Sequence, residues 1–244
     1  MAKENFNEPS LRAPFETFYG RNIEQMPLLV KDGREPVSVS EVMERRINSK
    51  NLAWKSNYFG TGDMIAYHPD GRVKVVLDAK QLREITPETS LVDGALTLAN
   101  GVYETLNGAE FKRTEAIFDK DLTPEGAKIN PFWQYVARGN GVLVSYVDTM
   151  FPEMKSQFEF DEAMGIYLLS APKQPQARAL YVGRLVSRSR LGGGDRLDGD
   201  DGRLVGVAPE ARGKLDQLVV EPTLEQAVAR VNREMGSLGL RLGK

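Results

Sequence analysis

Apolar and polar residues recur with two different periods along the chain, and this pattern predicts both strands and helices. The firmest element is a β-hairpin over residues 63–78, in which DMIAYH and RVKVVLD flank the turn residues 68–71. A helix is expected over residues 39–49, because Ser38 and Glu41 form a capping-box pair ahead of apolar positions that share one face.

The remaining pattern predicts several shorter elements. Further helices are expected over 102–118, from 130 onward and over 224–235, and the short apolar run at 142–150 suits either a helix or a strand, of which we favour the helix. Further strands are expected over 26–37 (around PLLV), 95–98, 163–170, 177–189 and 203–208, and in LDQLVVEP. We expect the three strands between 163 and 208 to form an antiparallel meander. Together these elements predict an α+β fold with a mainly antiparallel sheet and several packed helices.

The domain organisation follows from the same pattern. Residues 1–26 carry charges, prolines and isolated aromatic residues without a clear period, and we interpret them as an N-terminal arm. Residues 27–244 are expected to form a single α+β domain, since 41% hydrophobic and 27% charged residues are ordinary for a globular chain. Residues 192–202, GGGDRLDGDDG, predict a flexible hairpin connection with its turn at 200–202.

Composition narrows the functional classes. The net charge of -2 gives no overall field towards nucleic acid, so such binding would need a local basic face. The absence of cysteine removes disulfides, thiolate metal sites and cysteine nucleophiles, and the single histidine, His68, is expected to be a solvated turn residue. With no signal-peptide pattern and no apolar run of spanning length, we expect a soluble cytoplasmic protein with no cofactor and no membrane partner.

Three charged residues at the base of the hairpin suggest one kind of chemistry. Asp78 and Lys80 lie two residues apart, so on a strand they project from one face. Folding the hairpin about residues 70–71 pairs residues whose numbers sum to 141, which places Asp63 opposite Asp78. The three side chains could then hold Mg²⁺ and stabilise charge on a phosphate.

The segments GDMIA (62–66) and VVLDAK (75–80) are similar to the hairpin core of the PD-(D/E)xK nuclease and Holliday-junction resolvase family. The chain has Gly62 where that family usually has proline, and the shorter Asp78 in the second acidic position. The resemblance covers about nineteen residues. It implies a magnesium-dependent nuclease.

The resemblance also implies the roles of particular residues. Asp63, Asp78 and Lys80 would be catalytic, and Asp63 and Asp78 would bind the metal with Glu44 or Glu41 from the preceding helix. The structural alternative is that the two aspartates end the strands and Lys80 neutralises them at a solvated hairpin base.

Two other segments could bind ions. Arg184, Arg188 and Arg190 have the same parity, so a continuous strand would project all three from one face towards an anion or a phosphate backbone. A charged edge strand neutralised by nearby aspartates explains them equally well. The acidic loop 192–202 fails the EF-hand register at Gly202 and lacks the ending of a phosphate-binding loop.

No set of reactive residues has the spacing of a known catalytic constellation, so whether the chain is an enzyme stays open and our first hypothesis is a noncatalytic binding or interaction module. A protein partner or a second copy of the chain would be its partner. The alternatives are the magnesium-dependent nuclease and an anion or nucleic-acid binder that uses the arginine-bearing strand.

Overall fold

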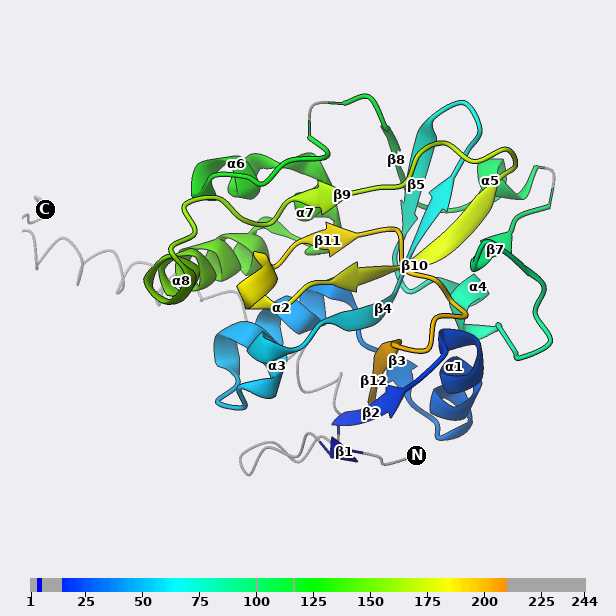
Figure 1. The fold of residues 1–244 in the computed structure, drawn as a ribbon, viewed down its shortest axis with the longest axis horizontal. Helices are drawn as coiled ribbons and strands as arrows, with labels where there is room; N and C mark the ends of the chain where they lie inside the picture. The colour runs from blue at the N-terminus through cyan, green and yellow to red at the C-terminus, as the bar shows by residue number, and fades with distance from the viewer. Residues whose placement is uncertain (1–3, 6–14, 100, 116, 210–244) are drawn as a thin grey trace, which may run out of the picture. The chain divides into compact units, whose positions relative to one another are not determined.

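The computed structural model describes residues 4–5, 15–99, 101–115 and 117–209 (Figure 1). The chain divides into a unit of Met1–Ala208 and a second unit of Pro209–Lys244. The strand expected in LDQLVVEP and the helix expected over 224–235 lie outside the described residues. The single domain expected over 27–244 therefore stays a prediction.

The fold is α+β with a large mixed sheet that is mainly antiparallel, which confirms the predicted class. The described strands are β1 Glu4–Asn5, β2 Phe15–Tyr19, β3 Glu35–Pro36, β4 Phe59–Tyr67, β5 Arg72–Val76, β6 Leu91–Val92, β7 Ala95–Thr97, β8 Ala109–Lys112, β9 Ile166–Tyr167, β10 Gln176–Val182, β11 Leu191–Gly192 and β12 Arg203–Val207. The described helices are α1 Asn22–Lys31, α2 Val39–Asn48, α3 Ala53–Ser56, α4 Lys80–Arg83, α5 Val102–Thr105, α6 Pro124–Ile129, α7 Pro131–Val136 and α8 Asn140–Phe158, with a 3-10 turn η1 at Leu185–Ser187.

The centre of the sheet follows the order β1-β2-β12-β4-β10-β11-β9. Strand β5 extends it from β4 and β8 from β5, while β7 pairs with β10 and β6 with β7. Two contacts are parallel, β12 with β4 and β11 with β9, and the others are antiparallel. Helix α2 packs against α8 and against β4 and β10. Helices α6 and α7 contact each other and α8, so these helices lie together beside this part of the sheet (Figure 1).

The predicted hairpin is confirmed as β4 and β5, but its register differs by one residue. Paired residues have numbers that sum to 140 rather than 141. A two-residue loop would need an N–H from Pro69, which has none. Instead His68 N–H donates to the carbonyl of Arg72 at 2.9 Å, and Gly71 closes a three-residue loop with φ of 89°.

Helix starts were the most predictable local feature. Helix α2 has the complete capping box, in which the Ser38 hydroxyl accepts the Glu41 N–H at 3.2 Å and the Glu41 carboxylate accepts the Ser38 N–H at 2.7 Å. The side chain of Asn130 caps α7. The helix expected through 142–150 is confirmed as part of α8, which begins after Gly139 at φ of 149°.

The strand expected around PLLV is wrong, because these residues belong to α1. Ile23, Met26 and Leu29 are buried at helical spacing, whereas Leu28 and Val30 are largely exposed. A short apolar run does not distinguish a strand from one buried helix face. The turn expected at 32–33 follows directly, with Gly33 at φ of 70°.

The helix expected over 102–118 is also wrong beyond its first turn. Helix α5 ends at Thr105, and the chain then forms β8 along the edge of β5, where Phe111 pairs with Val73. Gly108 lies so close to β5 that a Cβ there would be 2.1 Å from the Val75 carbonyl oxygen. Pairing between distant segments therefore overrides the local helical pattern.

The antiparallel meander expected between 163 and 208 is replaced by a different topology. Strand β9 pairs with β11 in parallel, β10 pairs with β4 and β7, and β12 pairs with β2, β3 and β4. Apart from the antiparallel contact between β10 and the next strand, β11, these short strands pair with strands that are not adjacent to them in the sequence.

The described part of residues 1–26 belongs to the folded unit. Strand β2 pairs with β12, and its Phe15 and Phe18 are buried. The boundary expected at residue 26 falls inside α1. Whether the residues before Phe15 form an arm stays a prediction.

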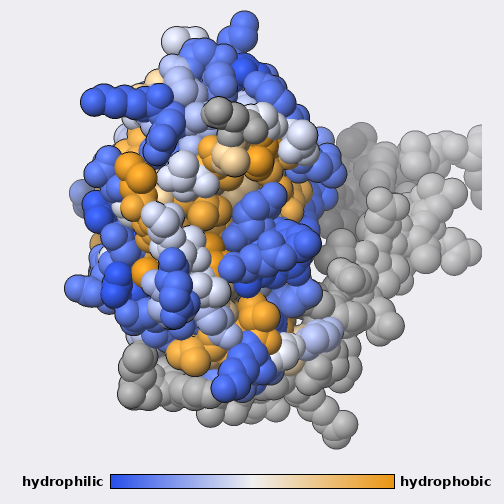
Figure 2. Space-filling model, turned by 90° about the vertical axis from the view of Figure 1, so that its right-hand side faces the viewer, coloured by the Kyte–Doolittle hydropathy of each residue, from blue (hydrophilic) through white to orange (hydrophobic). Residues whose placement is uncertain are grey.

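The side of the molecule that carries α1, α4, α5 and β7 has a mixed surface. Figure 2 shows apolar areas there separated by hydrophilic side chains. Scattered apolar residues of this kind are normal on a protein surface. In the part of the chain that the structure describes, no helix has the length and hydrophobicity needed to cross a membrane.

Candidate functional site

The base of the hairpin holds a buried aspartate that is bound on both oxygens. Asp63 is fully buried, and its carboxylate accepts the N–H of Val39 at 2.8 Å and the N–H of Asp78 at 3.0 Å. Val39 is the first residue of α2, where backbone N–H groups lack partners within the helix. Asp63 thereby joins the start of α2 to the end of the hairpin.

Arg138 completes this arrangement. Its guanidinium donates to Asp63 at 3.0 Å and to Asp78 at 2.6 Å, so one cation bridges the two carboxylates. Burial raises the pKa of Asp63, and Arg138 with the two backbone N–H groups lowers it in part. The bridge links the hairpin to the chain between α7 and α8.

The other residues of the nuclease hypothesis lie apart from this bridge. The exposed Lys80 begins α4 and forms an ion pair with Glu84 at 3.3 Å. The carboxylate of Glu41 is used in the capping box. Among the described residues, no group of three or more His, Asp or Glu side chains lies close enough together to hold a metal ion, and this includes Glu44. The geometry therefore gives no support to the nuclease alternative.

The three arginines do not share a strand. Strand β10 ends at Val182, the chain turns through η1, and Arg188 has a left-handed backbone with φ of 64°. Asp121, itself nearly buried, binds Arg188 at 3.2 Å and Arg190 at 2.6 Å. Arg184 lies over the ring of Tyr58, with 5.6 Å between the guanidinium carbon and the ring centroid. The predicted single cationic face is wrong, because the backbone bends and an aspartate from a distant segment neutralises two of the arginines.

A pocket of about 370 Å³ lies near these arginines and was not predicted. It is lined by two tyrosines and two aspartates with one glycine: Tyr58, Tyr181, Gly194, Asp195 and Asp201. We call it the tyrosine–aspartate pocket. Tyr58 directly precedes β4, Tyr181 lies on β10, and the other three residues belong to the segment between β11 and β12.

The glycine run at 192–194 is explained by the rings beside it. A Cβ at Gly192 would be 2.1 Å from ring carbons of Tyr181, and one at Gly193 would be 2.2 Å from the hydroxyl oxygen of Tyr67. The hydroxyl of Tyr67 donates to the Gly193 carbonyl at 2.9 Å. Glycine is required here because the chain lies directly against two aromatic side chains.

The segment between β11 and β12 is fixed by a buried arginine rather than forming a hairpin. Arg178 on β10 donates to the carbonyl oxygens of Gly194 at 3.2 Å and Asp195 at 3.3 Å, and also to that of Asp93. Leu197 is buried, and its N–H donates to the Gly94 carbonyl at 2.8 Å. These contacts place Asp195 at the pocket. Whether the exposed part of the segment is flexible stays a prediction.

Asp195 has the most unusual environment in the pocket. Its Oδ2 atom is buried and has no hydrogen-bond partner among the described residues. Burial, followed by the negative charge of Asp201, raises the pKa of Asp195 to about 6, although the N–H of Arg196 and the guanidinium of Arg178 lower it. A buried carboxylate oxygen without a hydrogen-bond partner costs free energy.

Burial and the pocket carboxylates also raise the pKa values of the two tyrosines. Burial and the charges of Asp195 and Asp201 raise the pKa of Tyr58, and burial with Asp195 raises the pKa of Tyr181. Both phenols therefore stay neutral hydrogen-bond donors at neutral pH. The hydroxyl of Tyr58 donates to the carbonyl of Asp201, which fixes its ring at the pocket wall.

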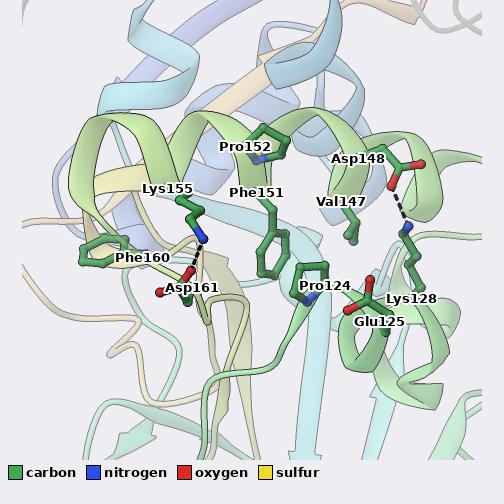
Figure 3. Close-up of a pocket in the computed structure, with 10 residues that line it drawn as sticks. All are labelled: Pro124, Glu125, Lys128, Val147, Asp148, Phe151, Pro152, Lys155, Phe160 and Asp161. Atoms are coloured by element: carbon green, nitrogen blue, oxygen red, sulfur yellow. Dashed lines mark ion pairs between the residues drawn. The ribbon is translucent and has the colours of Figure 1, made fainter.

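A second hollow, of about 400 Å³, lies along α8 and is shown in Figure 3. Its lining residues are Pro124, Glu125, Lys128, Val147, Asp148, Phe151, Pro152, Lys155, Phe160 and Asp161. Four of its charged side chains form ion pairs with each other, Lys128 with Asp148 at 2.5 Å and Lys155 with Asp161 at 2.6 Å. Because these charges are already paired, the tyrosine–aspartate pocket is the stronger candidate site.

Comparisons with known proteins support a fold but no family. No known protein family matches the sequence, and no curated protein matches it. A solved structure is similar, described as "Accommodation of massive sequence variation in Nanoarchaeota by the C-type lectin fold". The match has a TM-score of 0.60 and 17% identity, and it covers 82% of this chain and 100% of that chain. This likeness shows a C-type lectin fold.

Proposed function

We propose that the chain is a noncatalytic binding module whose ligand site is the tyrosine–aspartate pocket. The observation that carries the proposal is the buried Oδ2 atom of Asp195, which has no hydrogen-bond partner among the described residues although Asp195 lines an open pocket. Buried polar atoms in folded proteins are almost always hydrogen-bonded. A ligand that donates to this oxygen would supply the missing bond.

The construction of the pocket supports a binding role. Its volume of about 370 Å³ is at the lower end of the range for ligand sites, which suits one side chain or one small molecule. Arg178 holds the backbone on which Asp195 lies, so the site is formed before the ligand arrives. Preorganisation of this kind lowers the entropic cost of binding.

The fold comparison supports the same role indirectly. The similar structure from Nanoarchaeota is described as accommodating massive sequence variation in the C-type lectin fold. A fold that keeps its frame while its side chains change can present different pockets on one scaffold. We infer that this chain uses such a scaffold to present two tyrosines and two aspartates.

Ligand selection tests the proposed function. We expect ligands that the wild-type protein selects from a random peptide library or a glycan array to bind at least about 10-fold more weakly to Tyr181→Ala and Asp195→Asn, since both remove contacts within the pocket. Lys80→Ala changes an exposed residue paired with Glu84 and is the matched control, with unchanged binding. Ligands that bind Tyr181→Ala and Asp195→Asn as tightly as the wild type would contradict the proposal, provided that circular dichroism shows both variants folded.

A further inference from the structure

We infer that the tyrosine–aspartate pocket binds an organic cation, a guanidinium or a primary ammonium group. The inference rests on the proposed function and names the chemical class of its ligand. It follows from the carboxylates of the pocket, from the aromatic rings beside them and from the position of the nearest fixed cation.

The two carboxylates of the pocket favour a cationic ligand. Asp195 carries a buried oxygen without a partner, and Asp201 lies close enough for its charge to disfavour ionisation of Asp195. A cation between them would satisfy the oxygen and remove the repulsion together. A neutral ligand could supply only the hydrogen bond, and an anion would add to the repulsion.

The aromatic rings of the pocket also favour a cationic ligand. Tyrosine faces attract cations, and this chain uses that contact elsewhere, with Arg190 over Tyr167 at 4.9 Å and Arg203 over Tyr19 at 4.3 Å. Tyr181 lines the pocket, and no cation lies over its ring among the described residues. A ligand cation in the pocket would therefore meet both a carboxylate and the part of the Tyr181 ring that Gly192 leaves uncovered.

Arg178, whose charge lowers the pKa of Asp195, forms no ion pair with it among the described residues. Among the described residues, Arg178 donates only to backbone carbonyl oxygens, and its Nε has no partner. Arg196, which follows Asp195, is directed to Asp198 at 3.1 Å. The Asp195 carboxylate thus has no ion-pair partner within the described residues, which leaves this position for a ligand.

Binding of the cation should weaken as the pH falls. The charged or titratable groups that face Asp195 among the described residues are Asp201, Arg178, Tyr58 and Tyr181, and the last two stay neutral over the pH range of the experiment because their pKa values are raised. A cation prefers the ionised carboxylate. With its pKa at about 6, Asp195 is ionised at pH 7.5 and only about one-tenth ionised at pH 5, so affinity should fall about 10-fold on acidification.

The test uses a matched pair of probes. We expect N-acetyl-arginine methylamide to bind the full chain, by isothermal titration calorimetry at pH 7.5, at least about 10-fold more tightly than N-acetyl-citrulline methylamide, which has the same shape without the charge. Butylguanidinium provides a small-molecule cation with the same single charge and no peptide group. Tighter binding of butylguanidinium would indicate a free small molecule as the ligand, and tighter binding of the blocked arginine would indicate a peptide side chain.

Two variants locate the effect. Asp195→Asn keeps the shape of the pocket and should reduce binding of the arginine probe at least about 10-fold and abolish its pH dependence. It should melt at or above the wild-type temperature, because the amide removes the cost of burying a charge without a partner. Asp198→Asn changes an aspartate in the same segment that is paired with Arg196 outside the pocket, and it should bind like the wild type.

The remaining outcomes overturn the inference. Equal affinity for the arginine and citrulline probes, or a preference for a neutral sugar such as methyl glucoside, would show a pocket without selection for cations. The proposed binding function would survive that result if Tyr181→Ala lost the neutral ligand. No binding of either cationic probe at about 50 mM, or saturable binding of Ca²⁺ in place of the probes, would also reject the organic cation, since even weak side-chain contacts are measurable at that concentration.

Discussion

Replacing Arg46 with alanine is expected to lower the free energy of unfolding by about 4 kcal/mol, the largest loss from any single substitution considered for this chain. The Arg46 side chain is fully buried. Its five hydrogen bonds reach acceptors in four separate segments: Trp54 O at 2.8 Å, Asn57 O at 3.1 Å, Gly183 O at 2.8 Å, Tyr146 Oη at 3.0 Å and Ser189 Oγ at 3.0 Å. Alanine would leave the carbonyls of Trp54, Asn57 and Gly183 without this donor and would open a cavity beside them, while the hydroxyls of Tyr146 and Ser189 would keep only their bond to each other at 2.7 Å.

Urea unfolding followed by circular dichroism measures this effect. Arg46→Lys should lose about 2 kcal/mol, because an ammonium group cannot reproduce the planar five-donor geometry of guanidinium. Arg83→Ala is the matched control: Arg83 is partly exposed and pairs with Glu35 at 3.5 Å, so its loss should stay within about 1 kcal/mol. An Arg46→Ala loss of less than about 1 kcal/mol would show that Arg46 does not hold these segments together.

Replacing Asp63 with alanine is expected to lower the free energy of unfolding by about 3 kcal/mol. The substitution leaves the N–H groups of Val39 and Asp78 without an acceptor in the core and removes one of the two carboxylates bridged by Arg138. Helix α2 also loses a negative group at its N-terminus.

The same unfolding experiment separates this structural role from the nuclease hypothesis. Asp161→Ala is the control, because Asp161 is exposed and pairs with the exposed Lys155, and its loss should stay within about 0.5 kcal/mol. If Asp63→Ala instead keeps full stability and abolishes a magnesium-dependent cleavage of DNA, the structural role of Asp63 is contradicted and the nuclease hypothesis is supported.

Elements fixed by local chemistry could be predicted from the sequence. The capping box at Ser38 and Glu41, the Asn130 cap and the hairpin turn each depend on residues a few positions apart. The register of the hairpin was missed by one residue, although the reason was present in the sequence, since Pro69 cannot donate the hydrogen bond that the shorter loop needs.

Elements fixed by distant pairing could not be predicted in this way. Strand β8 forms because the edge of β5 is free to pair with it, and β9 and β11 are only two residues long and depend on each other. Short strands carry almost no periodic signal of their own. For the same reason, the sequence pattern predicted an antiparallel meander where the structure has a mixed sheet.

The candidate site illustrates this limitation at the level of single residues. The nearness of Asp63 and Asp78 followed from the hairpin, but Arg138, which bridges them, lies 60 residues after Asp78. The tyrosine–aspartate pocket draws on three separate segments. Its one local sign was the glycine run at 192–194, where the lack of a side chain indicates a close neighbour but not which neighbour.

The most direct test of the proposed site is to map where the arginine probe binds by two-dimensional NMR of the ¹⁵N-labelled full chain. We expect saturable shifts concentrated at the amides of the residues that line the pocket, Tyr58, Tyr181, Gly194, Asp195 and Asp201. Shifts confined to the hollow along α8, or spread over the surface without saturation, would contradict it.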